Sequence, residues 1–209
     1  MTIILNNIKP SYMSEDEVST SDIYMQPNVV FNSGKNYLIK ANSGHGKTSI
    51  LNFIYGSSTN YEGKINYNSD TEINVISLRK TKLSYVFQDY KLFPSLSVFQ
   101  NIILKNNLTH HKTQDQIDAL INHLNLGHKR DSLVENLSLG QKQRVAIIRA
   151  LCQPFHFILL DEPFSHLDPT NIKIVSALIQ KEAKQQNAGI IMTALDEVFA
   201  FNFDTTINL

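Results

Sequence analysis

The chain has 209 residues, enough for one sizeable hydrophobic core, so we expect a single domain spanning residues 1–209. Acidic and basic residues balance at 19 each, which argues against nucleic acid or an anionic lipid surface as the main partner. The start, MTIILNNIKP, lacks a signal-peptide pattern, and no run of about eighteen apolar residues occurs, so we expect a cytosolic chain without a membrane span.

The first third of the chain alternates strand-like segments with turn residues. Strands are expected within residues 2–8, 28–41, 62–68 and 82–88, the second of these with a Ser-Gly turn inside it. Only one helix is expected to interrupt them, beginning within residues 44–56.

From Pro94 to Leu151 apolar residues follow helical spacing, and this block is predicted to be mostly helical. After it we expect a strand at 156–160, an amphipathic helix at 169–186, a strand at 189–193, a short helix near 196–201 and a final strand at 205–209. Alternating strands and helices favour a parallel sheet, so the helical block is interpreted as an insertion into an α/β core. Cys152 ends an apolar periodic stretch and is expected to be a buried packing residue.

Residues 35–51, KNYLIKANSGHGKTSIL, place a strand, a glycine-containing loop and a helix in the order that a phosphate-binding loop requires. Lys47 would reach the terminal phosphates, and the Thr48 hydroxyl would ligate Mg²⁺. The usual pattern opens with a glycine where Ala41 stands, which is tolerable if Ala41 keeps φ below zero. The alternative interpretation is a flexible loop with an exposed lysine.

The apolar run FILL ends in two adjacent carboxylates, Asp161 and Glu162. In a phosphate-loop protein a second strand running beside the first delivers a carboxylate to the metal, so Asp161 would hold Mg²⁺ through water. Glu162 would act as general base towards the attacking water. The alternative is a strand end with two solvated acids, followed by a helix cap at Asp168.

The stretch LSLGQKQRVAIIRAL, residues 137–151, resembles the signature of the ABC ATPases. The order of phosphate loop, VFQDYKLFP, signature, ILLDEP and SHLD also matches, and the resemblance covers essentially the whole chain. It looks most like the small ATPases of lipoprotein-release, macrolide-export and cell-division complexes. The implied fold is an α/β P-loop NTPase core of mostly parallel sheet with an N-terminal antiparallel β part, residues 1–89 and 152–209, plus a helical signature subdomain, residues 90–151.

The resemblance also implies an activity and partners. ATP, with Mg²⁺, would bind the phosphate loop of one protomer and be covered by the signature of another in a head-to-tail homodimer or heterodimer. ATP hydrolysis would then power or gate integral membrane permease subunits at the inner face of the cell membrane. The resemblance does not decide whether the complex serves import, export or mechanical signalling. A non-transport ABC ATPase of DNA repair or translation is the alternative, but the chain lacks a long coiled-coil insertion and a second cassette.

Site residues follow from the motif positions. Gln88 falls on the Q-loop, Asp168 falls on the D-loop aspartate, and Tyr12 is the candidate for stacking on adenine, with Tyr24 as its rival. The implied nucleotide contacts are Tyr12, Asn42, Ser43, Gly44, His45, Gly46, Lys47, Thr48, Ser49, Ser138, Gly140 and Gln141. The implied metal contacts are Thr48, Gln88 and Asp161, and the implied catalytic residues are Lys47, Gln88, Glu162 and His166.

Three further positions depart from the family pattern. Leu139 replaces the first signature glycine, and Ala194 follows Thr193 where the family has a histidine. Alanine cannot supply the hydrogen bond that the histidine imidazole would donate to the γ-phosphate, so turnover is expected to be slower by about two to three orders of magnitude. A regulatory subunit with impaired hydrolysis is therefore an alternative function. His166 stands where alanine is usual; we hypothesise that it reaches across the dimer and partly replaces the missing imidazole, the alternative being a side chain that points to solvent.

Overall fold

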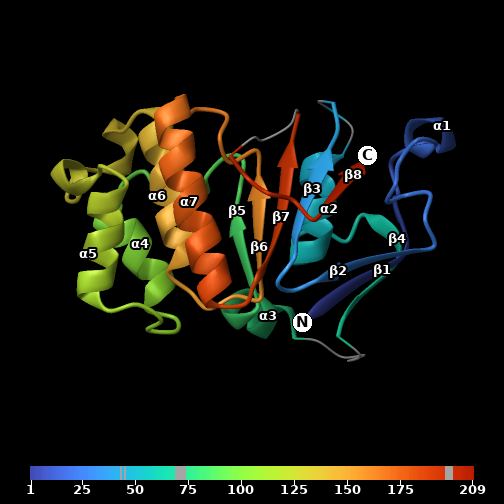
Figure 1. Cartoon of the computed structure of the whole chain (residues 1–209), viewed down its shortest axis with the longest axis horizontal. Coiled ribbons are helices and arrows are strands. Elements are labelled where there is room, and N and C mark those ends of the chain that lie inside the picture. Colours follow the sequence, from blue (N-terminus) through green and yellow to red (C-terminus); the bar gives the residue numbers. More distant parts are fainter. Residues whose placement is uncertain (43, 45, 69–73, 196–199) are drawn as a thin grey trace.

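The computed structural model describes residues 1–42, 44, 46–68, 74–195 and 200–209. Its centre is a five-stranded parallel sheet with the strand order β5-β6-β7-β3-β8 (Figure 1). The strands are β3 (Asn36–Lys40), β5 (Leu83–Val86), β6 (Phe157–Asp161), β7 (Gly189–Ala194) and β8 (Thr205–Asn208). The predicted parallel pairing is confirmed, and it brings the carboxyl ends of these strands to one edge of the sheet.

A second, antiparallel sheet lies on one side of the parallel sheet and has the order β2-β1-β4 (Figure 1). Its strands are β1 (Thr2–Pro10), β2 (Asn28–Asn32) and β4 (Tyr61–Tyr67). The turn at Ser33 and Gly34 therefore carries the chain from the antiparallel sheet into the parallel one.

The expectation of a single helix in the first third is wrong. Besides α2 (Lys47–Tyr55), the structure has α1 (Glu15–Val18) and α3 (Val75–Thr81). Local capping explains both, because Ser14 forms a capping box with Glu17, and the Asn74 side chain accepts from two first-turn amides. These helices are too short to show apolar periodicity, so only the caps could have revealed them.

The predicted helical block is confirmed, and its helices lie at the opposite end of the molecule from the antiparallel sheet (Figure 1). It contains α4 (Val98–Asn106), α5 (Gln114–His123), α6 (Leu139–Leu151) and two short 3-10 helices, η1 (Gly127–Lys129) and η2 (Val134–Asn136). α7 (Pro169–Gln185) follows β6. α4, α5 and α6 each begin with a capping box, and Asp168 caps α7 ahead of Pro169. The helix expected near residues 196–201 lies largely outside the described residues.

The parallel sheet is buried on both faces, as parallel sheets usually are. Successive strand residues point to opposite sides, so Leu160 packs with the helices α4 to α7, whereas Leu159 packs with α2 and the antiparallel sheet. Cys152 is fully buried in the helical-side core, and burial raises the pKa of its thiol to about 12. The predicted packing role of Cys152 is thereby confirmed.

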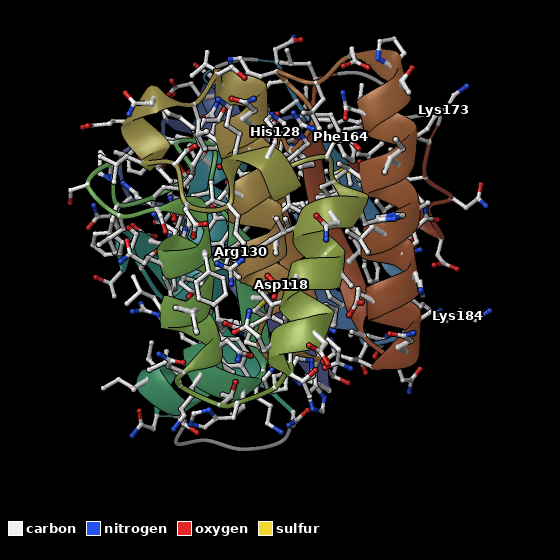
Figure 2. All side chains as sticks on the ribbon, turned by 90° about the vertical axis from the view of Figure 1, so that its left-hand side faces the viewer. Asp118, His128, Arg130, Phe164, Lys173 and Lys184 are labelled. Atoms are coloured by element: carbon white, nitrogen blue, oxygen red, sulfur yellow. The ribbon has the colours of Figure 1, made fainter. Side chains whose placement is uncertain are left out.

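The face formed by the helices is shown in Figure 2. There Arg130 donates to the Asp118 carboxylate at 2.8 Å, and its guanidinium lies 3.9 Å from the Phe99 ring centroid. These contacts join α4, α5 and the segment after η1, but an ion pair this exposed adds little stability. Among the described residues, no helix has the length and apolar character needed to cross a bilayer.

Candidate functional site

The loop between β3 and α2 has the backbone shape of an anion-binding turn. Gly44 and Gly46 adopt φ values of 86° and 84°, in the left-handed region that favours glycine. A side chain at Gly46 would also meet Met13 at 3.0 Å and the Tyr24 hydroxyl at 3.1 Å. Gly46 is the N-cap of α2, and among the described residues no side chain caps this helix, so its first-turn amides are suited to a ligand.

Lys47, at the first position of α2, is held by the loop that it follows. Its side chain is only 6% exposed, and Nζ donates to the carbonyl oxygens of Ala41 at 2.7 Å and Asn42 at 3.0 Å. Nζ also lies 3.3 Å from Glu162 Oε1. The alternative of an exposed lysine on a flexible loop is therefore wrong. Ala41 is not among the residues with positive φ, as its place in the pattern requires, while Ser43 and His45 lie outside the described residues.

Asp161 ends β6 and is 2% exposed, so the alternative of two solvated acids is wrong for this residue. Burial raises the pKa of Asp161, and hydrogen bonds from Thr193 and Thr48 oppose that rise. The expectation that its strand runs directly beside the strand of the phosphate loop is also wrong, because β7 lies between β6 and β3.

Thr193, on that intervening strand, holds both acids. Its hydroxyl donates to Asp161 Oδ1 at 2.8 Å and accepts from the backbone N–H of Glu162 at 3.2 Å. Glu162 has φ 46°, a left-handed conformation that costs a non-glycine residue about 1–2 kcal/mol. Thr193 was not predicted as a site residue, although a polar side chain in the apolar strand 189–193 was an available signal.

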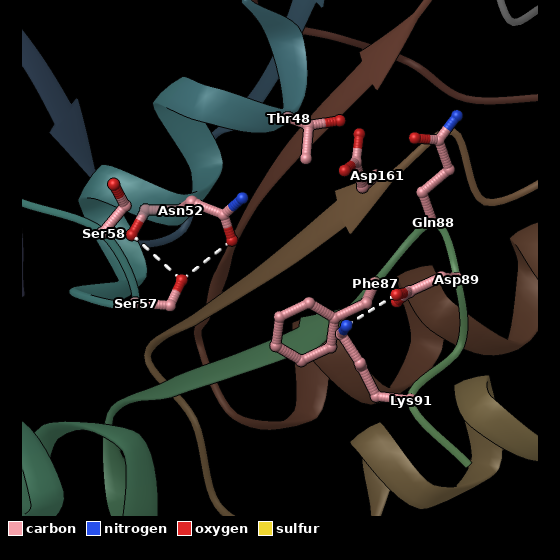
Figure 3. Close-up of a pocket in the computed structure, with 9 residues that line it drawn as sticks. All are labelled: Thr48, Asn52, Ser57, Ser58, Phe87, Gln88, Asp89, Lys91 and Asp161. Carbon is pink, nitrogen blue, oxygen red and sulfur yellow. Dashed lines mark hydrogen bonds and ion pairs between the residues drawn. The ribbon is translucent and has the colours of Figure 1, made fainter. Parts of the chain in front are cut away.

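Gln88 follows β5 and faces the acids from the other side. Its Nε2 lies 3.4 Å from Glu162 Oε2. In Figure 3 the side chains of Thr48, Asp161 and Gln88 point towards a common space. Hydroxyl, carboxylate and amide oxygens are ligands that suit Mg²⁺, which normally keeps waters and takes phosphate oxygens for the rest. The donor set therefore fits the metal, and the described residues contain no cluster of three or more His, Cys, Asp or Glu that would favour another ion.

A cavity of about 230 Å³ opens in front of the loop. It is lined by Tyr12, Met13, Gly44, Gly46, Lys47, Thr48, Ser49, Gln88 and Glu162. A second cavity of about 490 Å³ adjoins it and shares Thr48 and Gln88 (Figure 3). Tyr12 is 56% exposed at the rim, with its hydroxyl hydrogen-bonded to Ser49, whereas the Tyr24 ring is buried and its hydroxyl donates to the Gly46 carbonyl at 3.4 Å.

The signature motif begins α6 at the surface. Ser138 is the N-cap, its hydroxyl accepts from Gln141 N–H, and the Gln141 side chain accepts from Ser138 N–H. Leu139 is 53% exposed, so its side chain has room away from the motif backbone. A Cβ on Gly140 would lie 2.7 Å from the His166 carbonyl, so glycine permits close contact between α6 and the turn after β6.

His166 is exposed, but its ring is held within the same chain. Nδ1 lies 2.8 Å from the Tyr90 hydroxyl and 2.9 Å from the Ser165 hydroxyl. The other ring nitrogen, Nε2, is the atom that the hypothesised contact across a dimer would use. Asp168 accepts from Thr170 and Asn171 amides as the cap of α7, and the backbone N–H of Asn171 is the main cause of its lowered pKa.

Ala194 ends β7 beside the phosphate loop. It is paired with Lys40, and its carbonyl accepts from Ala41 N–H at 3.5 Å. A small apolar cavity of about 140 Å³ lies next to it, and Glu162 lines both this cavity and the one in front of the loop. The methyl group of Ala194 thus borders open space at the site that the family histidine would occupy.

A strand, a glycine turn with a buried lysine, and a carboxylate at the carboxyl end of another strand of the same parallel sheet together define a P-loop nucleotide hydrolase. Residues 24–165 match the family model described as ABC transporter, and the chain belongs to that family. It is therefore an ABC-type ATPase.

Relatives and solved structures agree with this membership. The chain is 32% identical over 193 residues to the ABC transporter ATP-binding protein YclH of Bacillus subtilis, covering 90% of this chain and 85% of YclH. It is 27% identical over 209 residues to the putative hemin import ATP-binding protein HrtA of Staphylococcus haemolyticus, with 96% and 94% coverage. The dimeric structure of MJ0796, a bacterial ABC transporter cassette, superposes with a TM-score of 0.76 at 25% identity, covering 93% of this chain and 88% of that one.

Proposed function

We propose that the chain is the ATP-binding subunit of a membrane transport complex and that two copies, or one copy and a related subunit, close head to tail around ATP. The observation that supports this is the presence of two separate exposed helix N-termini, each suited to an anion. The glycine loop with Lys47 forms one, and the N-terminus of α6, with Ser138 and Leu139 exposed, forms the other. The dimeric MJ0796 cassettes, one of them bound to ADP and phosphate, support this arrangement.

Within each site the roles follow from the contacts. Lys47 and the α2 amides would bind the terminal phosphates, Thr48 and Asp161 would hold Mg²⁺, and Glu162 would accept the proton of the attacking water. The exposed ring of Tyr12, at the cavity rim, supports it over the buried Tyr24 as the platform for adenine.

The dimer is tested with Glu162→Gln, which should bind ATP but hydrolyse it slowly. With ATP and Mg²⁺ this variant should elute as a dimer in size-exclusion chromatography, and without nucleotide it should not. Adding Ser138→Ala should shift the ATP concentration for half-dimerisation upward about tenfold, whereas Lys142→Ala on the same helix should not. A dimer that ignores nucleotide would contradict the proposal.

An apolar groove of about 320 Å³ supports the proposed membrane partner. It lies between β5, α4 and α6, and its lining includes Phe93, Leu104 and Leu108, which are 55%, 43% and 52% exposed. The segment that carries Gln88 also contributes Phe87 to it. We infer that a cytosolic segment of the permease docks here, which would place the protein at the inner face of the membrane. Leu108→Asp should abolish recruitment to membranes containing the permease and leave ATPase activity in solution unchanged.

A second candidate function is favoured by Ala194. The site lacks an imidazole there, so the chain could act as a subunit that binds ATP and pairs with a competent partner but hydrolyses slowly. Comparing ATP affinity with steady-state hydrolysis separates the two: micromolar binding with negligible turnover, restored by a partner subunit, would favour this regulatory role.

A further inference from the structure

Gln143 is a buried polar residue on α6 that has no place among the predicted site residues. It is 2% exposed, although the helix face around it carries Val145, Ala146 and Ile147. Its two polar atoms are both engaged with the turn that follows Asp161. Oε1 accepts from the His166 backbone N–H at 3.2 Å, and Nε2 donates to the Glu162 carbonyl at 3.4 Å.

These two contacts fix the orientation of the amide. A backbone N–H can only donate and a carbonyl can only accept, so the amide oxygen must face His166 and the amide nitrogen must face Glu162. One side chain thus spans both ends of the turn, residues 162–166. The turn also carries its own hydrogen bond, from Ser165 N–H to the Glu162 carbonyl at 3.3 Å, and the two hydrogen bonds of Gln143 join the turn to α6.

Glu162 needs such support from outside the turn, because a left-handed backbone is unfavourable for a non-glycine residue and persists only where several neighbouring contacts hold it. Its N–H is held by Thr193 on β7, and its carbonyl by Gln143 on α6. With both sides of the residue fixed, the carboxylate is aimed at Lys47 and Gln88, 3.3 Å and 3.4 Å away.

We propose that Gln143 is a positioning residue for the reaction: its amide holds Glu162 in the conformation that serves as general base and links that base to the signature helix. The link rests on the proposed function, since Ser138, at the start of the same helix, would meet the nucleotide of the other protomer. Within one protomer, Gln143 thus connects Glu162, the base for the ATP on its own phosphate loop, with Ser138, which would cover the ATP of the other protomer.

The test compares Gln143→Met, which keeps the volume but loses both hydrogen bonds, with Gln143→Glu, which keeps the acceptor for His166 but loses the donor to Glu162. Lys142→Ala is the control. We expect both Gln143 variants to lower kcat at least tenfold while the Kd for ATP, measured by calorimetry, stays within threefold of the parent. A kcat within threefold of the parent in Gln143→Met overturns the proposal.

A double-mutant cycle with Glu162→Gln separates positioning from a purely structural role. If Gln143 acts through the base, single-turnover hydrolysis by Glu162→Gln should not fall further when Gln143→Met is added. An equal loss with and without Glu162 refutes the proposal, as does failure of both Gln143 variants to fold. ATP-driven dimerisation of the single variant Glu162→Gln is measured alongside, because failure of that variant to dimerise with ATP would refute the proposed function instead.

Discussion

Replacing Ala194 with histidine should accelerate hydrolysis. Residue 194 lies beside the start of the phosphate loop, and the cavity next to it adjoins Glu162. The volume of about 140 Å³ is close to that of engineered cavities of about 150 Å³ that accept benzene, and an imidazole ring is smaller than benzene. The new side chain should therefore fit without the strain of about 1–3 kcal/mol that overpacking typically costs.

The magnitude follows from the chemistry of the added group. A hydrogen-bond donor aimed at a phosphoryl-transfer site is worth about 2.7–4 kcal/mol, so kcat should rise by about two to three orders of magnitude. The Kd for ATP should change much less, because a donor that acts mainly in the transition state leaves ground-state binding nearly unaltered.

The assay is phosphate release at saturating ATP and Mg²⁺, with Ala194→Leu as the matched control that fills the same space without a donor. Free imidazole, added to the parent protein, should give a smaller acceleration that Ala194→Leu abolishes. If Ala194→His folds, binds ATP and turns over within threefold of the parent, the inference that a missing donor limits this enzyme is refuted.

Three further predictions concern the site. Burial raises the pKa of Asp161 above its usual 3.8, so the protonated carboxyl stabilises the fold. This stabilisation is complete below pH 3.8 and is lost as pH rises through the raised pKa. Asp161→Asn should flatten this part of the curve of Tm against pH, raise the Tm at pH 7 without Mg²⁺, and abolish Mg²⁺-dependent turnover. Tyr12→Ala should weaken ATP binding about tenfold in calorimetry, roughly the worth of one aromatic contact, whereas Tyr24→Phe should lower the free energy of unfolding by about 1 kcal/mol through its lost hydrogen bond and spare ATP binding. Tyr90→Phe removes one of the two hydrogen bonds to the His166 ring and leaves the one from Ser165; an unfolding free energy lower by about 0.5–1.5 kcal/mol in urea titration is expected, and an unchanged value would show that the Tyr90 bond adds no stability.

The sequence pattern could predict those elements that are determined by residues close together along the chain. The strand before Ala41 and the glycine loop that follows it were both predicted, because each depends on neighbours along the chain. Sheet order was not, since nothing in the residues around Asp161 records that β7 lies between its strand and β3. The role of Thr193 was missed for the same reason.

Contacts between distant segments also set the orientation of side chains. The partners of His166 include Tyr90, 76 positions away, and those of Gln143 include Glu162, 19 positions away. A polar residue on the buried face of a helix marks Gln143 as unusual, but only the fold identifies which carbonyl it meets.

The helix α6 also contacts the chain near Gln88. Arg149, in its last turn, donates to the carbonyls of Tyr90 and Lys91 at 2.7 Å each, so the C-terminal end of this 13-residue helix is held by the segment after Gln88, as Gln143 holds its middle to the turn after β6. If the proposed membrane partner displaces the chain near Lys91, α6 should tilt with it, and the position of Ser138 relative to a second subunit should change as well.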